Sequence, residues 1–372
     1  MSIKIVGLVD CFDNPELGPL TQHRSVASTS FLGRFAYVDF PLSNFLNSGI
    51  NSIGILCQKH IRSLSHHVGN GRSWISNTKL GDLQVLYDEP NVANSAYNTD
   101  VADLVENKVF LRDVHPDYVV LVEPNFVYEA NFAKLVQEHI ASGSRVSLLY
   151  THVAKGLSTS YLGQRKVTIN VHGKIKSMET NVGDEDSGDI SLGALILDYP
   201  MLESLIEYAK GTSAFFSLFD CLSYLAPTGM VRAVRFDGYV RCFDSLTHYL
   251  EYSLELLDRS VFDKLFAPDW PIHTRTYDTP PVRYAEGSDV KNCYLANGCF
   301  IKGSVSNSIL GRNVIIEPGA VVSNSVIGND VVIGQGAHLD RVVCDRDAKV
   351  LHVSELSGTA EAPLYIARGD IV

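Results

Sequence analysis

Long hydrophobic runs are missing from this sequence, which has no apolar stretch near the roughly 20 residues needed to cross a bilayer. We therefore expect neither a membrane span nor a signal peptide. Positive charge is also scarce, because 31 Lys and Arg stand against 42 Asp and Glu, giving a net charge of −11. Such an excess of negative charge argues against binding to nucleic acid or to an anionic membrane. A cytoplasmic protein is the plain expectation.

Paired cysteines are absent as well. The seven cysteines are scattered along the chain, odd in number, and nowhere form a Cys-x-x-Cys motif. This usage predicts reduced, mostly buried thiols rather than disulfides or a zinc site. With 372 residues and 45% apolar content, the chain is long enough for a substantial core and a second module.

Short, continuous apolar runs in the first two thirds of the chain predict strands that are buried on both faces. Helical patterns lie between them, at 131–142 with Asn131 as the expected N-cap and at 245–258 with Ser245 as the expected N-cap. Strands that alternate with helices predict an α/β domain with a mostly parallel sheet. The expected strands are 3–9, 52–57, 117–122, 145–150, 191–197 and 231–236.

A proline-rich segment at 262–288 predicts a linker between an α/β domain at 1–261 and a second domain at 289–372. In the second domain aliphatic residues recur every six positions, with glycines in the turns between them. This period predicts a left-handed parallel β-helix of hexapeptide repeats, a module that packs against a neighbouring domain or subunit. The residues expected to point inward are Ile309, Ile315, Val321, Ile327, Ile333 and Leu339.

Several blocks together resemble glucose-1-phosphate adenylyltransferase, the ADP-glucose pyrophosphorylase of glycogen synthesis. They are PLT at 19–21, Arg24, FLGRFAYVDFPLSNFLNSGI at 31–50, YVVLV at 118–122, SLGALILD at 191–198 and DWPIHT at 269–274. The resemblance covers nearly the whole chain. It implies a Rossmann-like nucleotidyltransferase domain before the β-helix, and a family reaction that joins ATP and glucose 1-phosphate into ADP-glucose and pyrophosphate.

The family's cation-handling residues are missing at three places. The resemblance puts Asn125 and Cys242 where the family has its two magnesium carboxylates. The loop before PLT carries Asp10, Asp13 and Glu16 instead of a glycine-rich phosphate loop with Arg. Magnesium prefers carboxylate oxygens, and phosphoryl transfer needs cations at the transferred group. We therefore expect no catalytic residue and no bound metal in this chain, with magnesium held by a catalytic partner.

This coordinated loss resembles the GlgD-type subunit of bacterial ADP-glucose pyrophosphorylase. The resemblance implies a non-catalytic, regulatory subunit that assembles with a catalytic subunit into a hetero-oligomer, expected to be a tetramer, or with itself when alone. Two alternatives stay open. One is an autonomous nucleotidyltransferase whose metal ligands have moved to Glu123 and Asp244; the weaker one is a hexapeptide acyltransferase that uses His338.

Several other polar residues can be given either a structural or a functional role. By resemblance, Ser191 and Glu179 stand where the family contacts the glucose ring and glucose 1-phosphate, and we expect a substrate-binding remnant there. His23, Arg24 and Arg34 lie where the family gathers cations for a sugar-phosphate activator, which makes them a possible effector anion site. Asp39 is expected to cap a helix. His66 and His67 are expected on a solvated helix face.

Overall fold

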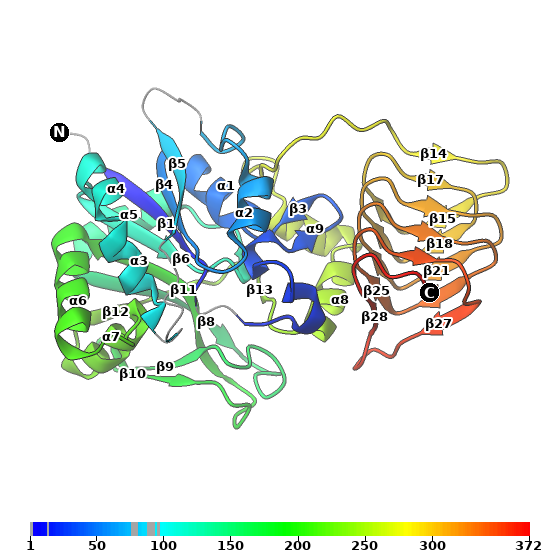
Figure 1. Ribbon diagram of the computed structural model, residues 1–372. Coiled ribbons are helices and arrows are strands. Elements are labelled where there is room, and N and C mark those ends of the chain that lie inside the picture. Colours follow the sequence, from blue (N-terminus) through cyan, green and yellow to red (C-terminus); the bar gives the residue numbers. More distant parts are fainter. Residues whose placement is uncertain (1–2, 13–14, 76–80, 88–93, 95–96) are drawn as a thin grey trace.

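The computed structural model describes residues 3–12, 15–75, 81–87, 94 and 97–372. Asp13 of the acidic loop lies outside the described residues. An α/β domain occupies one end of the molecule and a triangular β-coil the other, joined by an extended segment (Figure 1). In the part of the chain that is described, no helix has the length and apolar character that crossing a membrane requires.

The α/β domain is built on one large sheet with the order β10-β9-β11-β6-β1-β4-β5, in which β8 also pairs with β11 and β12 pairs with β8. The run β6-β1-β4-β5 is parallel, whereas β11 runs antiparallel to β6 and β8. All six strands predicted from apolar runs are present. The strands are β1 (Ile5–Asp10), β4 (Ser52–Leu56), β5 (Asp82–Leu86), β6 (Tyr118–Val122), β8 (Val146–Val153), β9 (Arg165–Ile169), β10 (Ile175–Thr180), β11 (Gly188–Asp198) and β12 (Val231–Arg235).

Helices cover both faces of this sheet. The two predicted N-caps are confirmed: the side chain of Asn131 accepts from the Lys134 amide and that of Ser245 from the His248 amide. The helices are α1 (Asp39–Asn47), α2 (Ile61–Val68), α3 (Asp100–Glu106), α4 (Lys108–Val114), α5 (Phe132–Ser142), α6 (Tyr199–Thr212), α7 (Leu218–Leu225), α8 (Leu246–Glu255) and α9 (Arg259–Leu265), with short 3₁₀ turns η1 (Gly18–Thr21), η2 (Val26–Ser28) and η4 (Ala226–Thr228).

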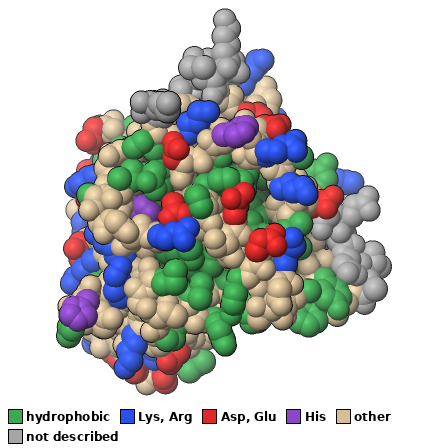
Figure 2. Space-filling view, turned by 90° about the vertical axis from the view of Figure 1, so that its left-hand side faces the viewer, with side chains coloured by type: hydrophobic (Ala, Val, Ile, Leu, Met, Phe, Trp, Pro, Cys, Tyr) green, Lys and Arg blue, Asp and Glu red, His purple; other side chains and the backbone are tan. Residues whose placement is uncertain are grey.

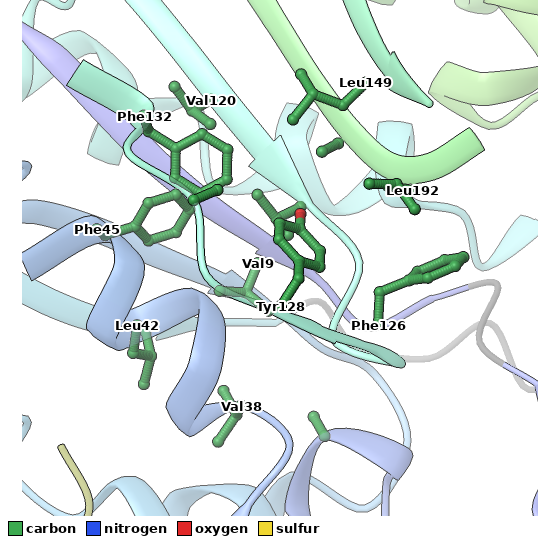
Figure 3. Packing of buried hydrophobic residues seen from close by; sticks show 14 of the residues in the cluster. Val9, Val38, Leu42, Phe45, Val120, Phe126, Tyr128, Phe132, Leu149 and Leu192 are labelled. Atoms are coloured by element: carbon green, nitrogen blue, oxygen red, sulfur yellow. The ribbon is translucent and has the colours of Figure 1, made fainter. Parts of the chain in front are cut away.

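Neighbouring residues of each strand contribute to two separate cores. Val9 and Val120 face one side, where Phe45 of α1 and Phe132 of α5 pack with ring centroids 5.5 Å apart (Figure 3). Leu8 and its neighbours on other strands face the opposite side. Because successive side chains of a strand alternate between faces, burial on both sides accounts for the continuous apolar runs.

Two small antiparallel pairs lie outside the large sheet. They are β2 (Ser30–Phe31) with β3 (Phe35–Ala36), and β7 (Phe126–Tyr128) with β13 (Val240–Cys242). The β7-β13 pair brings two segments that are distant in sequence to the same place, directly beyond the end of β6.

The second domain is a β-helix whose three faces are parallel five-stranded sheets. Strand pairing advances 17 residues in most coils, as in the pairs Ile316–Ile333 and Ile327–Cys344. It advances 15 residues between Ile301 and Ile316, and 22 between Cys344 and Ile366. The strands are β14 (Arg283–Tyr284), β15 (Asp289–Lys291), β16 (Tyr294–Leu295), β17 (Phe300–Ile301), β18 (Ser304–Ser306), β19 (Ile309–Leu310), β20 (Ile315–Ile316), β21 (Val321–Ser323), β22 (Val326–Ile327), β23 (Val332–Ile333), β24 (His338–Asp340), β25 (Val342–Cys344), β26 (Lys349–Val350), β27 (Glu355–Ser357) and β28 (Leu364–Ile366).

The predicted six-residue register is only partly right. Ile327, Ile333 and Leu339 point into the coil as expected. Val321 is 37% exposed and Ile315 is half-buried, while their successors Val322 and Ile316 fill the interior. Ile309 is buried, but against the α/β domain.

A tight corner explains this shift. Asn307, Asn324 and Arg341 occupy the same corner of successive coils with left-handed φ values of 45°, 47° and 51°. Asparagine tolerates this conformation better than most residues. At this corner the step from one inward position to the next is five residues instead of six, as from Val322 to Ile327. A strict hexad count carried across it therefore slips by one residue.

The two domains share one apolar seam. Phe31 and Tyr249 of the α/β domain belong to the same buried cluster as Ile309, Val326 and Val343 of the β-helix. A buried ion pair crosses the seam, in which the Arg24 guanidinium donates to both Asp345 carboxylate oxygens at 2.8 and 2.6 Å. Contacts of this kind couple the position of one domain to the other.

Candidate active-site remnant and anion cavity

Asn125 and Cys242 are brought together by the β7-β13 pair. Asn125 lies in the turn between β6 and β7, and Cys242 ends β13 opposite Phe126. The Asn125 amide donates to the Cys242 sulfur at 3.6 Å and to Gln164 Oε1 at 3.3 Å. The scaffold therefore still converges on one point at the two positions where the family resemblance puts metal carboxylates.

This point is neutral. Asn125 and Cys242 are each 1% exposed, and burial raises the pKa of the Cys242 thiol well above its ordinary value. A buried amide and a protonated thiol are poor ligands for magnesium, which takes hard oxygen donors. Within the described residues, no group of three or more His, Cys, Asp or Glu side chains is placed to hold a metal. The residues present do not fit the family's magnesium ion.

Glu123 and Asp244, the alternative metal ligands, are held in other interactions. Glu123 is 3% exposed and accepts from Arg165 at 2.6 Å. A Cβ on Gly193 would lie 2.1 Å from Glu123 Oε2, so the glycine leaves the room that this carboxylate occupies. Asp244 binds the His248 ring and accepts from the Leu162 amide at 3.2 Å.

The two residues expected to form a sugar-binding remnant lie on different strands, one buried and one exposed. Ser191 is buried at an irregular point of β11, and its hydroxyl accepts from the Gly193 amide at 3.1 Å. Glu179 lies exposed on β10, the outermost strand of the sheet on that side. Ser191 therefore takes part in the backbone structure of β11, and its role in sugar binding stays a prediction, as does that of Glu179.

The described part of the acidic loop follows β1 directly. Asp10 is 3% exposed and accepts from the Phe12 amide at 3.0 Å, while Glu16 is exposed. Leu17 donates to the Thr21 hydroxyl at 3.0 Å and leads into η1. A phosphate group at the end of β1 would meet a buried carboxylate there, and like charges repel.

A cavity of about 280 Å³ lies between the domains, and five arginines and three histidines line it. His23, Arg24 and Arg34, the three residues predicted for an effector site, all line it. Sequence reasoning missed the remaining cations, because they come from distant segments. His66 and His67 come from α2, and Arg312, Arg346 and Arg368 come from the β-helix.

The arginines of this cavity differ in whether they already pair with a carboxylate. Arg24 is committed to Asp345, and Arg346 and Arg368 contact Asp347 at 3.1 and 3.5 Å. Among the described residues, neither Arg34 nor Arg312 forms an ion pair with a carboxylate. Burial lowers the pKa of Arg312, and the nearby Arg34 guanidinium adds to this effect. Two close cations without a carboxylate partner are a suitable environment for an anion.

Two expectations about α1 and α2 were wrong, the cap at Asp39 and the solvated position of His67, whereas His66 is exposed as expected. Val38, not Asp39, is the N-cap of α1. Asp39 is fully buried, accepting from the Ala36 amide at 2.9 Å and contacting His67 Nε2 at 2.6 Å. His67 therefore lies between a buried carboxylate and the cavity instead of on a solvated face. The contact between Asp39 and His67 joins residues 28 positions apart, so no local helix pattern reveals it.

Two family models match the chain. The nucleotidyl transferase model covers residues 16–179, and the GlmU-like C-terminal hexapeptide model covers residues 282–359. These matches agree with the two domains of the structure and with the strand pairing of the β-helix.

Individual relatives extend the match along the whole chain. The glycogen biosynthesis protein GlgD of Geobacillus stearothermophilus is 32% identical, over 100% of this chain and 98% of the relative. GlgD of Bacillus subtilis is 29% identical, over 95% and 92% of the two chains. Glucose-1-phosphate adenylyltransferase of Fervidobacterium nodosum is 29% identical, over 82% and 74%. The chain therefore belongs to the family of GlgD glycogen biosynthesis proteins and glucose-1-phosphate adenylyltransferases.

Proposed function

We propose that this chain is a non-catalytic subunit of glucose-1-phosphate adenylyltransferase in cytoplasmic glycogen synthesis. It acts by assembling with a catalytic subunit and modulating it. The contact between Asn125 and Cys242 carries the proposal, because both magnesium carboxylates of the resemblance are replaced by neutral groups that now bind each other.

The chemistry of the reaction supports this reading. Attack of a sugar phosphate on the α-phosphate of ATP builds negative charge on the transferred group and on the leaving pyrophosphate. This chain offers a buried Asp10 at the end of β1 and no carboxylate pair at Asn125 and Cys242. Binding of magnesium and ATP therefore belongs to the catalytic partner, which keeps the cation-handling residues.

The cavity between the domains supports the modulating role. A phosphate ester that binds Arg34 and Arg312 would contact both domains at once, since the two residues come from opposite sides of the seam. An effector changes a partner's affinity only by binding one conformational state better than another. A ligand that bridges two domains is well placed to do so, and a coupling of about 1–3 kcal/mol is ordinary.

An assay of the chain alone separates this proposal from the autonomous enzyme. With magnesium, ATP and glucose 1-phosphate, we expect negligible ADP-glucose formation. Turnover near the median of ordinary enzymes, about 10 per second, would overturn the proposal and favour displaced ligands at Glu123 and Asp244. The Glu123→Gln variant should show the same negligible rate of ADP-glucose formation, because Glu123 pairs with Arg165 and is not expected to hold a metal.

Co-expression with a catalytic glucose-1-phosphate adenylyltransferase subunit from the same organism tests the partnership. We expect the two chains to elute together in size-exclusion chromatography as a hetero-oligomer, a tetramer by resemblance. Separate elution at all mixing ratios would contradict it.

Ligand binding tests the cavity independently of assembly. Inorganic pyrophosphate should raise the melting temperature of the isolated chain, and Arg312→Gln should abolish most of this rise. Arg259→Gln is the matched control, because Arg259 is 80% exposed on α9. An equal rise in all three proteins would place the anion elsewhere.

A further inference from the structure

Two cysteines stand side by side at the carboxyl ends of neighbouring strands. β1 and β4 pair in parallel with Asp10 opposite Leu56, and the next residue on each strand is a cysteine. The Cys11 amide donates to the Leu56 carbonyl at 3.0 Å, which continues the ladder by one residue and puts Cys11 opposite Cys57. The Cys57 amide in turn donates to the Leu86 carbonyl at 3.0 Å, so its backbone is fixed from the other side.

This placement matches the geometry of a disulfide. Residues at the same register position of adjacent strands project their side chains to the same face, and adjacent strands lie about 4.8 Å apart. Disulfides join residues whose Cα atoms are about 4.4–6.8 Å apart. The two thiols are close enough for Cys57 to raise the pKa of Cys11, and the Cys57 sulfur donates to the Lys59 carbonyl at 3.2 Å.

Partial exposure together with an adjacent cysteine distinguishes this pair from the other thiols. Cys11 is half-buried at the start of the acidic loop, whereas Cys57 is 1% exposed beneath it. Cys221, Cys242, Cys299 and Cys344 are buried, and Cys293 lies half-buried in the β-helix. A small oxidant can therefore reach Cys11, and Cys57 lies next to Cys11 on the neighbouring strand.

We propose that Cys11 and Cys57 form a redox-active dithiol that low-molecular-weight disulfides, such as oxidised glutathione, convert into an intramolecular disulfide. The Cys11 thiolate attacks one sulfur of the oxidant, forming a mixed disulfide and releasing one glutathione thiolate. The Cys57 thiolate then attacks the Cys11 sulfur, closing the protein disulfide and releasing the second glutathione. Two protein thiols are oxidised and one external disulfide is reduced to two thiols, which balances the exchange.

The surroundings of Cys11 determine when this reaction runs. The contacting Cys57 thiol, burial and the Asp10 carboxylate all raise the pKa of Cys11 well above its ordinary value. The nucleophilic thiolate is therefore scarce at neutral pH, and oxidation should accelerate as the pH rises from 7 to 9. The disulfide would tie the beginning of the acidic loop to the segment that leads into α2. It should also raise the melting temperature, because it constrains the unfolded chain.

Oxidation of the reduced full chain with glutathione disulfide tests the proposal. Remaining thiols are alkylated, the protein is digested without reduction, and peptides are identified by mass spectrometry. We expect a disulfide-linked pair of peptides that contain Cys11 and Cys57, and dithiothreitol should separate them. The Cys293→Ser variant should give the same linked pair. In Cys57→Ala, Cys11 should instead accumulate as a stable glutathione adduct, because the resolving thiol is gone.

Three results would overturn the proposal. They are free Cys11 and Cys57 after prolonged oxidation at pH 9, a stable glutathione adduct on Cys11 in the unaltered chain, and a disulfide between two molecules. Each can be read in the same digest. None depends on the assembly or catalytic state of the chain, so the outcome is independent of the proposed function.

Discussion

The side-chain amide of Asn125 donates a hydrogen bond to the sulfur of Cys242 at 3.6 Å, although 117 residues separate the two in sequence. The fold brings these positions together, and the contact between them is neutral because burial raises the pKa of the Cys242 thiol. Introducing charge here is therefore a direct physical test of what this site tolerates.

The double variant Asn125→Asp, Cys242→Asp should lose stability without gaining synthesis of ADP-glucose. Two adjacent carboxylates at positions that are 1% exposed cannot both ionise at low cost. We expect a lower melting temperature at pH 8 than at pH 5, relative to the unaltered chain. Cys293→Asp, at a half-buried position, is the control. A large gain in ADP-glucose formation would mean that the acidic loop does not prevent ATP binding.

Asp345→Asn should destabilise the junction between the domains. It leaves the Arg24 guanidinium, whose side chain is 10% exposed, without its carboxylate partner. Breaking a buried pair from one side costs about 3–5 kcal/mol. Asp347→Asn is the matched control, since its side chain is 41% exposed and its ion pairs are worth less than about 1 kcal/mol. Equal shifts of the melting temperature in both variants would show that the Arg24 pair is not important for stability.

Ile316→Asp and Val321→Asp should differ sharply, although a strict hexad count predicts Val321 to be the inward residue. Ile316 is fully buried and Val321 is 37% exposed. A buried unpaired carboxylate costs several kcal/mol, whereas an exposed one costs little. Thermal unfolding followed by circular dichroism measures the difference. The opposite order would restore the hexad register and refute the 17-residue coil.

Glu129 gives the protein a pH-dependent component of stability. Burial raises its pKa to about 7, although it accepts from the Ala267 amide at 3.0 Å. The folded state therefore binds this proton more tightly than the unfolded state, and stability falls as the pH rises from about 4.5 toward 7. The melting temperature of Glu129→Gln relative to the unaltered chain should rise over this interval. Glu138→Gln, on an exposed position of α5, should show no such trend.

Local sequence signals predicted most of the architecture. The continuous apolar runs of β1, β4 and β6 and the N-caps Asn131 and Ser245 depend on residues close in sequence, so short-range physics was sufficient. The repeat of the β-helix was equally visible. Its register slipped because a left-handed corner at Asn324 shortens the step between inward residues, and a side-chain period does not show this backbone conformation.

The sites were predictable only where each segment carried its own signal. Asn125 and Cys242 stood out through the family resemblance, and the structure places them in contact. The pairing of His67 with Asp39, and the contribution of Arg312 to the cavity, depend on how distant segments pack. Such contacts have no local pattern, which is why the sequence predicted three cations of the cavity and missed the rest.

The proposal that this chain works through a catalytic partner can be tested by kinetics. The measurement is the initial rate of ADP-glucose formation by a catalytic glucose-1-phosphate adenylyltransferase subunit of the same organism, titrated with this chain. We expect the rate or the effector response to change with the mixing ratio and to saturate at a fixed stoichiometry, while this chain alone stays inactive. A rate that is independent of the ratio, with unchanged substrate and effector affinities, would contradict it.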